Sequence, residues 1–333
     1  MSKPTIADVA RHCSVSIATV SQVLTNKGRI SSKTRQRVLE AVETLGYVYN
    51  QTAANLRHKT SNLVGLVTPD ITNPFYAELI AGLSHYLEQH NTLLFLANAE
   101  ENVERQKQFI DSLLSQNAAG MVICPAMDTD IEYLETVKSR GLPIVMAVRP
   151  MGYEQFDYVG TNNFMGVQLA TEHLIKLGHR HIGFVGGLKQ SRTRSYRLGG
   201  YLSKLIEHGI PFNDHYIRTC GANRSDAAKQ TKELLEQHPE ITAIIGYQDI
   251  VAFGVMRAVR EQGKQVGKDI SVIGFDDVPE AADTNPPLTT VSVSAREIGR
   301  TAGSLILERM QQNKQPVRSV VLPPQLVLRE SCS

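Results

Sequence analysis

The chain has 333 residues, 42% of them hydrophobic, which is enough for two or three domains with substantial cores. Residues 1–60 contain nine Lys or Arg and three Asp or Glu, whereas the remainder carries a net negative charge, so we expect the N-terminal segment to bind a polyanion. The four cysteines lie far apart, no apolar run could span a membrane, and the N-terminus has no apolar signal core. These features predict a cytoplasmic protein without disulfides, metal or cofactor.

Three short helices are predicted within residues 1–48. Thr5 and Asp8 form a capping-box pattern that begins the first helix. After a tight turn, Ser16 caps a second helix that ends at Leu24. Two short helices around a tight turn are typical of helix-turn-helix DNA-binding domains, although a generic helical bundle is the alternative.

A third helix is expected to follow Ser31 or Ser32 and to end at Gly46. The hydrophobic spacing predicts inward side chains on the second and third helices at Val20, Val23, Leu24, Val38, Leu39, Val42 and Leu45. Three helices of this length form one compact bundle.

Short motifs in this region favour the DNA-binding interpretation. They are Asp8-Val9-Ala10, Val15-Ser16, Thr19-Val20-Ser21, Thr34-Arg35 with Val38, and Gly46-Tyr47 with Asn50. Together they resemble the N-terminus of LacI/GalR-family repressors. The resemblance implies a transcription regulator, a repressor of carbohydrate-utilisation genes, that binds palindromic double-stranded operator DNA as a homodimer.

The resemblance also implies roles for individual residues. The expected contacts to the DNA backbone, or residues that position it, are Thr5, Ser16, Thr19, Ser21, Thr25, Ser31, Thr34, Arg35 and Tyr47. The expected base readers are Ile17, Ala18 and Gln22. Many relatives carry Arg at the position of Gln22, so the operator preference of this chain is expected to differ from the commonest site of the family.

Within a hinge and linker segment of residues 49–60, Thr52–Arg57 resembles the hinge helix of the family. Asn50 and Ala53 are expected to contact DNA, and Leu56 is expected to act as a wedge in the minor groove. A helix this short is unstable alone, so we expect it to order on DNA.

Residues 61–333 alternate between strand-like and helix-like segments, which predicts an α/β body of two lobes with doubly wound parallel sheets. The expected strands are 63–67, 93–97, 121–124, 144–148, 182–185, 216–219, 243–246, 272–274, 288–293 and a pair within 320–327. The expected helices are 76–89, 103–115, 131–140, 164–177, 196–208, 226–236, 250–262 and 296–311. Lobe one is expected to comprise about 61–161 and 292–322, and lobe two about 162–291 and 323–333.

A cleft between two such lobes binds its ligand at the carboxyl ends of the strands. The candidates that follow strand ends are Asn73, Phe75, Asn98, Arg149, Arg192, Arg194, Arg197, Tyr247, Gln248 and Asp276. Charged, amide and aromatic groups together suit a hydroxylated ligand.

The motifs NPFYAEL, RLGGY, AIIGYQD and GFDD resemble LacI/GalR sensor domains, which are periplasmic-binding-protein-like and related to sugar-binding proteins. SRTRSYRLGGY in particular resembles regulators of maltose-type sugar uptake. The resemblance implies a small sugar-like effector and makes Arg197 and Asp276 the firmest contacts. A phosphorylated sugar bound by Arg149, Arg192, Arg194 and Arg197 is one alternative, and a nucleobase-type corepressor is another.

Other classes of function find less support. A solute-binding protein would need an export signal and no basic N-terminal segment. Nucleophile-elbow, Walker, dinucleotide-binding and HExxH motifs are absent from the sequence, so we expect no enzyme activity. His173, His179 and His181 are expected to be structural. Without leucine heptads near the C-terminus, we expect a dimer and not a tetramer.

Overall fold

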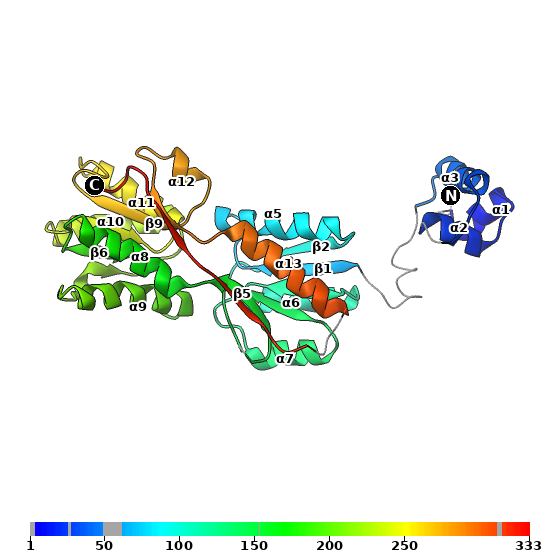
Figure 1. Cartoon of the computed structure of the whole chain (residues 1–333), viewed down its shortest axis with the longest axis horizontal. Coiled ribbons are helices and arrows are strands. Elements are labelled where there is room, and N and C mark those ends of the chain that lie inside the picture. The colour runs from blue at the N-terminus through cyan, green and yellow to red at the C-terminus, as the bar shows by residue number, and fades with distance from the viewer. Residues whose placement is uncertain (1–3, 26–27, 49–61, 153, 312–314) are drawn as a thin grey trace. The chain divides into compact units, whose positions relative to one another are not determined.

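The computed structural model describes residues 4–25, 28–48, 62–152, 154–311 and 315–333. The chain divides into two compact units, the head (Met1–Ser61) and the body (Asn62–Ser333), which are described separately (Figure 1). Among the described residues, no helix combines the length and hydrophobicity needed to cross a membrane.

The head contains α1 (Ile6–His12), α2 (Ile17–Leu24) and α3 (Ser32–Leu45). Each helix begins after a hydroxyl residue whose side-chain oxygen accepts a hydrogen bond from the backbone N–H three residues later. Gly46, with φ 61°, ends α3 in the left-handed conformation. The predicted limits of the three helices are confirmed.

The core of the head differs from the prediction at one position. Val20, Val23 and Val38 are buried as expected, but Leu39 is 49% exposed. Ala41 is buried in its place, because positions three and four residues from Val38 share its helix face and position 39 does not.

Lobe one of the body contains six parallel strands in the order β2-β1-β3-β4-β5-β11. They are β1 (Leu63–Thr68), β2 (Leu93–Asn98), β3 (Gly120–Ile123), β4 (Ile144–Ala147), β5 (Asp157–Thr161) and β11 (Ser319–Leu322). One face of the sheet is covered by α5 (Pro74–Gln89) and α13 (Ala295–Gln311), and the other by α6 (Val103–Ser115) and α7 (Ile131–Ser139) (Figure 1).

Lobe two repeats this strand order as β7-β6-β8-β9-β10-β12, with β12 antiparallel to β10. Its strands are β6 (Ile182–Val185), β7 (Ile217–Arg218), β8 (Ala243–Gly246), β9 (Ser271–Asp276), β10 (Thr289–Ser292) and β12 (Gln325–Val327). Its helices are α8 (Asn163–Lys176), α9 (Arg192–Glu207), α10 (Arg224–Gln237) and α11 (Asp249–Glu261), with the short η1 (Asp214–Tyr216) and α12 (Glu280–Asp283).

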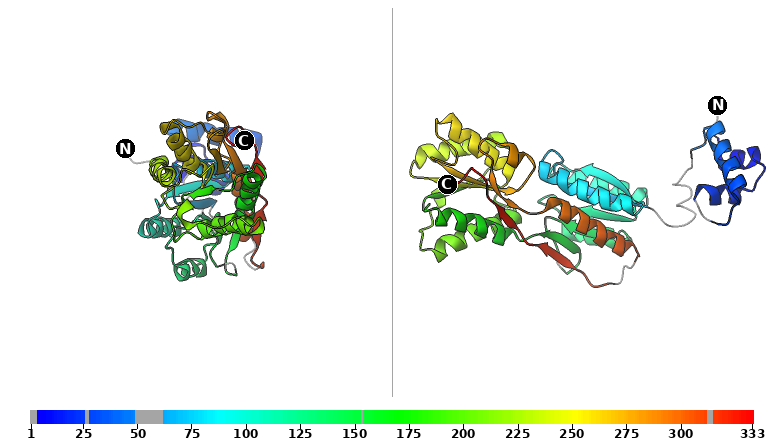
Figure 2. Two further views of the ribbon diagram at one scale, coloured as in Figure 1. Left: turned by 90° about the vertical axis from the view of Figure 1, so that its left-hand side faces the viewer. Right: turned by 45° about the horizontal axis from the view of Figure 1, so that its top comes forward.

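The chain passes between the lobes three times, from β5 to α8, from β10 to α13 and from β11 to β12 (Figure 2). The predicted α/β class with two parallel-sheet lobes is confirmed. Several elements differ in detail from the prediction. The strand β5 was not predicted, and α9 begins at Arg192 and not at Tyr196, because Ser191 caps it.

Candidate DNA-binding and ligand-binding sites

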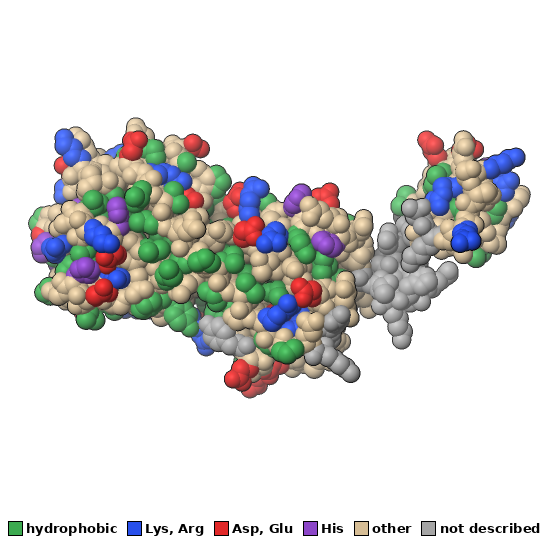
Figure 3. Space-filling model, in the orientation of Figure 1, with side chains coloured by type: hydrophobic (Ala, Val, Ile, Leu, Met, Phe, Trp, Pro, Cys, Tyr) green, Lys and Arg blue, Asp and Glu red, His purple; other side chains and the backbone are tan. Residues whose placement is uncertain are grey.

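The helix α2 separates a buried face from an exposed face. Val20 and Val23 are buried in the head core, whereas Ile17, Ala18 and Gln22, the expected base readers, are exposed. Lys and Arg side chains lie on the surface of the head (Figure 3). An exposed helix face of this size fits the major groove of DNA.

The expected phosphate contacts Thr5, Ser16 and Ser31 are the caps of the three helices. Ser16 Oγ accepts from the Thr19 N–H at 3.0 Å and lies 2.8 Å from Thr19 Oγ1. Ser31 and Thr34 repeat this arrangement. Because helix N-termini carry partial positive charge, these hydroxyls lie where a phosphate group is electrostatically favoured.

The remaining expected DNA contacts differ in exposure and in structural role. Thr25 Oγ1 donates to the Ser21 carbonyl at 2.7 Å. Arg35 is half-buried on α3, and Tyr47 packs against the head core. Three further expected contacts lie outside the described residues, namely Asn50, Ala53 and Leu56.

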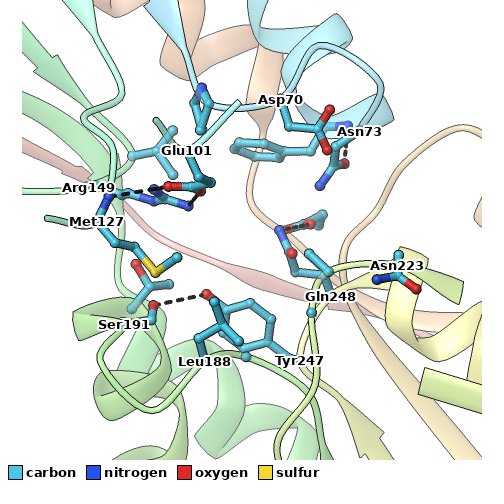
Figure 4. Close-up of a pocket in the computed structure, with 18 of the residues that line it drawn as sticks. Asp70, Asn73, Glu101, Met127, Arg149, Leu188, Ser191, Asn223, Tyr247 and Gln248 are labelled. Carbon is cyan, nitrogen blue, oxygen red and sulfur yellow. Dashed lines mark hydrogen bonds and ion pairs between the residues drawn. The ribbon is translucent and has the colours of Figure 1, made fainter. Parts of the chain in front are cut away.

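A cavity of about 380 Å³ lies between the two lobes of the body (Figure 4). Its walls are the loops that follow β1, β2, β3 and β4 in lobe one and β6, β7, β8 and β9 in lobe two. These are the carboxyl ends of the parallel strands, where open α/β sheets bind ligands. The expected contacts that line it are Asn73, Phe75, Arg149, Arg197, Tyr247, Gln248 and Asp276.

Arg197 and Asp276 form a buried ion pair in lobe two, with Nη2 and Oδ1 3.6 Å apart. Arg197 Nε donates to Asn163 Oδ1 at 2.8 Å, and its Nη1 donates to the Tyr247 carbonyl. The guanidinium carbon lies 3.6 Å from the centre of the Phe275 ring and 4.7 Å from that of Tyr247. Arg197 is therefore held on several sides before any ligand binds.

Burial raises the pKa of Asp276 to about 8, although Arg197 acts in the opposite direction. Gln248 Nε2 donates to Asp276 Oδ2 at 3.2 Å. Asp276 also has a φ of 123°, a conformation that side-chain-bearing residues rarely adopt. A ligand hydroxyl that donates to this carboxyl group would favour its ionised form.

Three candidates that the sequence placed near the cavity do not line it. Arg192 is exposed on α9. Arg194 is buried, and its Nε donates to the Gly186 carbonyl at 3.1 Å. Asn98 Oδ1 accepts from the Ile71 N–H at 3.3 Å and so links the end of β2 to the loop after β1.

Several lining residues were missed by the sequence analysis. They lie in the loops that follow strands and include Asp70, Glu101, Met127, Leu188, Ser191 and Asn223 (Figure 4). Ser191 and Asn223 cap α9 and α10. A search of every loop after a predicted strand would have found them, because both sheets present these loops to the same cavity.

Two of the three histidines considered as metal ligands, His179 and His181, make hydrogen bonds to hydroxyl groups. His179 pairs with Thr242 Oγ1 at 2.8 Å and Ser271 Oγ at 3.0 Å. His181 pairs with the Tyr216 hydroxyl at 3.0 Å. Each ring therefore has a structural role in lobe two.

Residues 5–50 match the model of bacterial regulatory proteins of the lacI family, and residues 61–330 match that of periplasmic binding proteins and the sugar binding domain of the LacI family. The chain is 34% identical to the maltose regulon regulatory protein MalI of Escherichia coli (strain K12), over 98% of both chains. The solved lac repressor dimer bound to operator and the anti-inducer ONPF is 28% identical, with a TM-score of 0.86 over 99% of both chains. The transcriptional regulator CelR in complex with cellobiose is 27% identical, with a TM-score of 0.75 over 98% of this chain and 99% of that one.

Proposed function

Since the chain belongs to the LacI family of bacterial regulatory proteins, we propose that it is a sequence-specific DNA-binding repressor controlled by a small ligand in the body. The observation that carries the proposal is the exposed face of α2, where Ile17, Ala18 and Gln22 lie opposite the buried face. This chain thus joins a groove-reading helix to a body with a ligand-sized cavity. It acts in the cytoplasm, where operator DNA is found, and catalyses no reaction.

The ligand of this proposal is a neutral mono- or disaccharide. Both arginines of the cavity lining face carboxylates, Arg197 with Asp276 and Arg149 with Glu101. A sugar phosphate would have to compete with those carboxylates, whereas neutral hydroxyls can bind between them. The cellobiose complex of CelR and the maltose regulon regulator MalI support a sugar.

A homodimer completes the proposal, and the edge of lobe one supports it. Strand β2 is an edge strand, and its Leu93, Phe95 and Leu96 side chains are exposed. An exposed apolar edge strand promotes aggregation unless another surface covers it. A two-fold dimer built on this edge would match a palindromic operator. The similar lac repressor is a dimer in its complex with operator.

Two measurements on the full-length protein test this function. A randomised-DNA selection should recover a palindromic site, and a thermal-shift screen of sugars should identify the ligand by a raised melting temperature. Asp276→Ala should lower the affinity for that sugar by about 2 kcal/mol or more, because a charged hydrogen-bond partner is lost from a buried site. Asp283→Ala, an exposed change on α12, is the matched control. Recovery of no preferred DNA sequence would contradict the proposal.

A further inference from the structure

Three loops of lobe one meet at an ion pair on the cavity wall (Figure 4). Arg149 Nη1 donates to Glu101 Oε2 at 2.9 Å and Arg149 Nη2 donates to Glu101 Oε1 at 2.6 Å, so the pair is bidentate. Arg149 Nη1 also donates to the Pro125 carbonyl at 3.0 Å, and the Met127 N–H donates to Glu101 Oε2 at 3.2 Å. The loops after β2, β3 and β4 are thereby joined through Glu101 and Arg149.

The backbone at this pair is unusual. Glu101 has a φ of 55° and Val148, which precedes Arg149, has a φ of 65°. A β-branched residue in the left-handed region is strained, and strain of this kind concentrates at functional sites. The surrounding structure therefore maintains a costly conformation beside the cavity.

The two arginines of the cavity differ in how accessible they are. The Arg197 side chain is 5% exposed and surrounded by aromatic rings and hydrogen-bond partners. The Arg149 side chain is 22% exposed. An anion entering the cavity would thus reach Arg149 first, and Glu101 occupies both terminal nitrogens of that guanidinium.

The other charges of the lining do not favour an anion. The lining contains three carboxyl groups, those of Asp70, Glu101 and Asp276, and two guanidinium groups. Asp70 Oδ1 accepts from the backbone N–H and hydroxyl of Thr72 at 2.8 and 2.6 Å. Removal of the Glu101 carboxylate would therefore leave the positive charge of Arg149 uncompensated at the place where a ligand can approach.

We propose that Glu101 determines the charge of the ligand, because it occupies Arg149 and so excludes phosphorylated sugars from the cavity. This proposal rests on the function proposed above, since it specifies which ligands the same cavity accepts. Glu101 acts as a specificity-determining and positioning residue. In Glu101→Gln the Pro125 carbonyl still holds Arg149, while the positive charge of the guanidinium becomes available to a phosphate group.

Calorimetric titration of the full-length protein with inorganic phosphate and glucose 6-phosphate tests this proposal. Glu101→Gln should bind glucose 6-phosphate at least about ten-fold more tightly than the wild type, the gain expected from one charge-assisted hydrogen bond. The double change Glu101→Gln with Arg149→Gln should abolish the gain. Glu101→Asp keeps the carboxylate and should continue to exclude both anions.

Glu104→Gln is the matched control, since it removes the same charge from an exposed position on α6 that does not line the cavity. Glu101→Ala provides a second test with the same expected gain, and melting temperatures without ligand check that each variant folds. If neither variant at position 101 gains affinity, or if the gain survives loss of Arg149, the proposal is wrong. A wild type that binds no neutral sugar would contradict the proposed function alone, because these titrations require neither operator nor sugar binding.

Discussion

In the head, the side chains proposed to read DNA lie exposed on one helix, whereas in the body the proposed ligand contacts come from loops, helices and a strand end of two lobes and are largely buried. Ile17, Ala18 and Gln22 share the outer face of α2. Arg197 and Asp276 come from α9 and β9 and are 4% and 5% exposed. Changes in the body should therefore affect stability and ligand binding together, while changes in the head should affect DNA binding at little cost in stability.

Arg197→Met is expected to have the largest effect, because it leaves Asp276 buried without its partner. Loss of one member of a buried ion pair costs about 3–5 kcal/mol, so above about pH 8, where Asp276 is ionised, the free energy of unfolding of the body should fall by up to that amount. Denaturant unfolding followed by circular dichroism measures it. Arg192→Met, an exposed change one turn earlier on α9, should stay within about 0.5 kcal/mol of the wild type. Similar losses of unfolding free energy for both variants would show that the buried Arg197 stabilises the body no more than the exposed Arg192 does.

The pH dependence of stability gives a second test of the buried site. Burial raises the pKa of Asp276 to about 8 and that of Asp249 to about 6, whereas an unfolded Asp titrates near 3.9. Between these values the folded body retains protons that the unfolded chain releases, so the free energy of unfolding should fall as the pH rises. Subtraction of the Asp276→Asn curve should leave a fall of about 1 kcal/mol per pH unit from about pH 5 to pH 8.

The affinity for a neutral sugar should change in the opposite direction over the same interval. A sugar hydroxyl donates to an ionised carboxylate, so binding should strengthen as Asp276 loses its proton. Calorimetric titration at several pH values measures this trend. If the difference in unfolding free energy between the wild type and Asp276→Asn is flat or rises with pH, Asp276 is ionised over the whole interval.

The same contrast explains what the sequence could predict. The helix limits and caps of the head were predictable because Thr5, Ser16 and Ser31 act within three residues of themselves. The strand and helix order of the body followed from hydrophobic periodicity. The role of Glu101 could not be predicted, because its partner Arg149 is 48 residues away in sequence.

One error has a local cause. Arg192 was expected near the ligand as a residue that follows a strand end, and the helix after it was predicted to begin only at Tyr196. The cap at Ser191 adds a turn to α9, and Arg192 then lies on its exposed side. A missed cap thus shifted a candidate residue from a loop to a helix surface.

Gln22→Arg should change which sequence the head prefers. The Gln22 amide can accept from and donate to adenine, whereas Arg in its place favours guanine. The preference at one operator position per half-site should shift from adenine to guanine by about 1–3 kcal/mol, as measured by randomised-operator selection. Gln36→Arg adds the same charge on the exposed surface of α3 and should strengthen binding to all sequences alike. Identical preferred sites for the wild type and Gln22→Arg would rule out Gln22 as a base reader.

Ser16→Ala should have the smallest effect, and it separates stability from DNA binding in the head. Its Oγ accepts from the Thr19 N–H, and loss of such a cap costs about 1 kcal/mol in the free energy of unfolding. Ser32→Ala, at an exposed position that does not cap α3, is the control.

Ser16→Asp then distinguishes the two roles of this residue, because Asp also caps helices but repels phosphate. We expect Ser16→Asp to unfold at the same denaturant concentration as the wild type but to bind all DNA sequences more weakly, most of all at low salt. Equal DNA affinities at low salt would show that Ser16 acts only as a cap, and the phosphate contact would then have to come from elsewhere in the head.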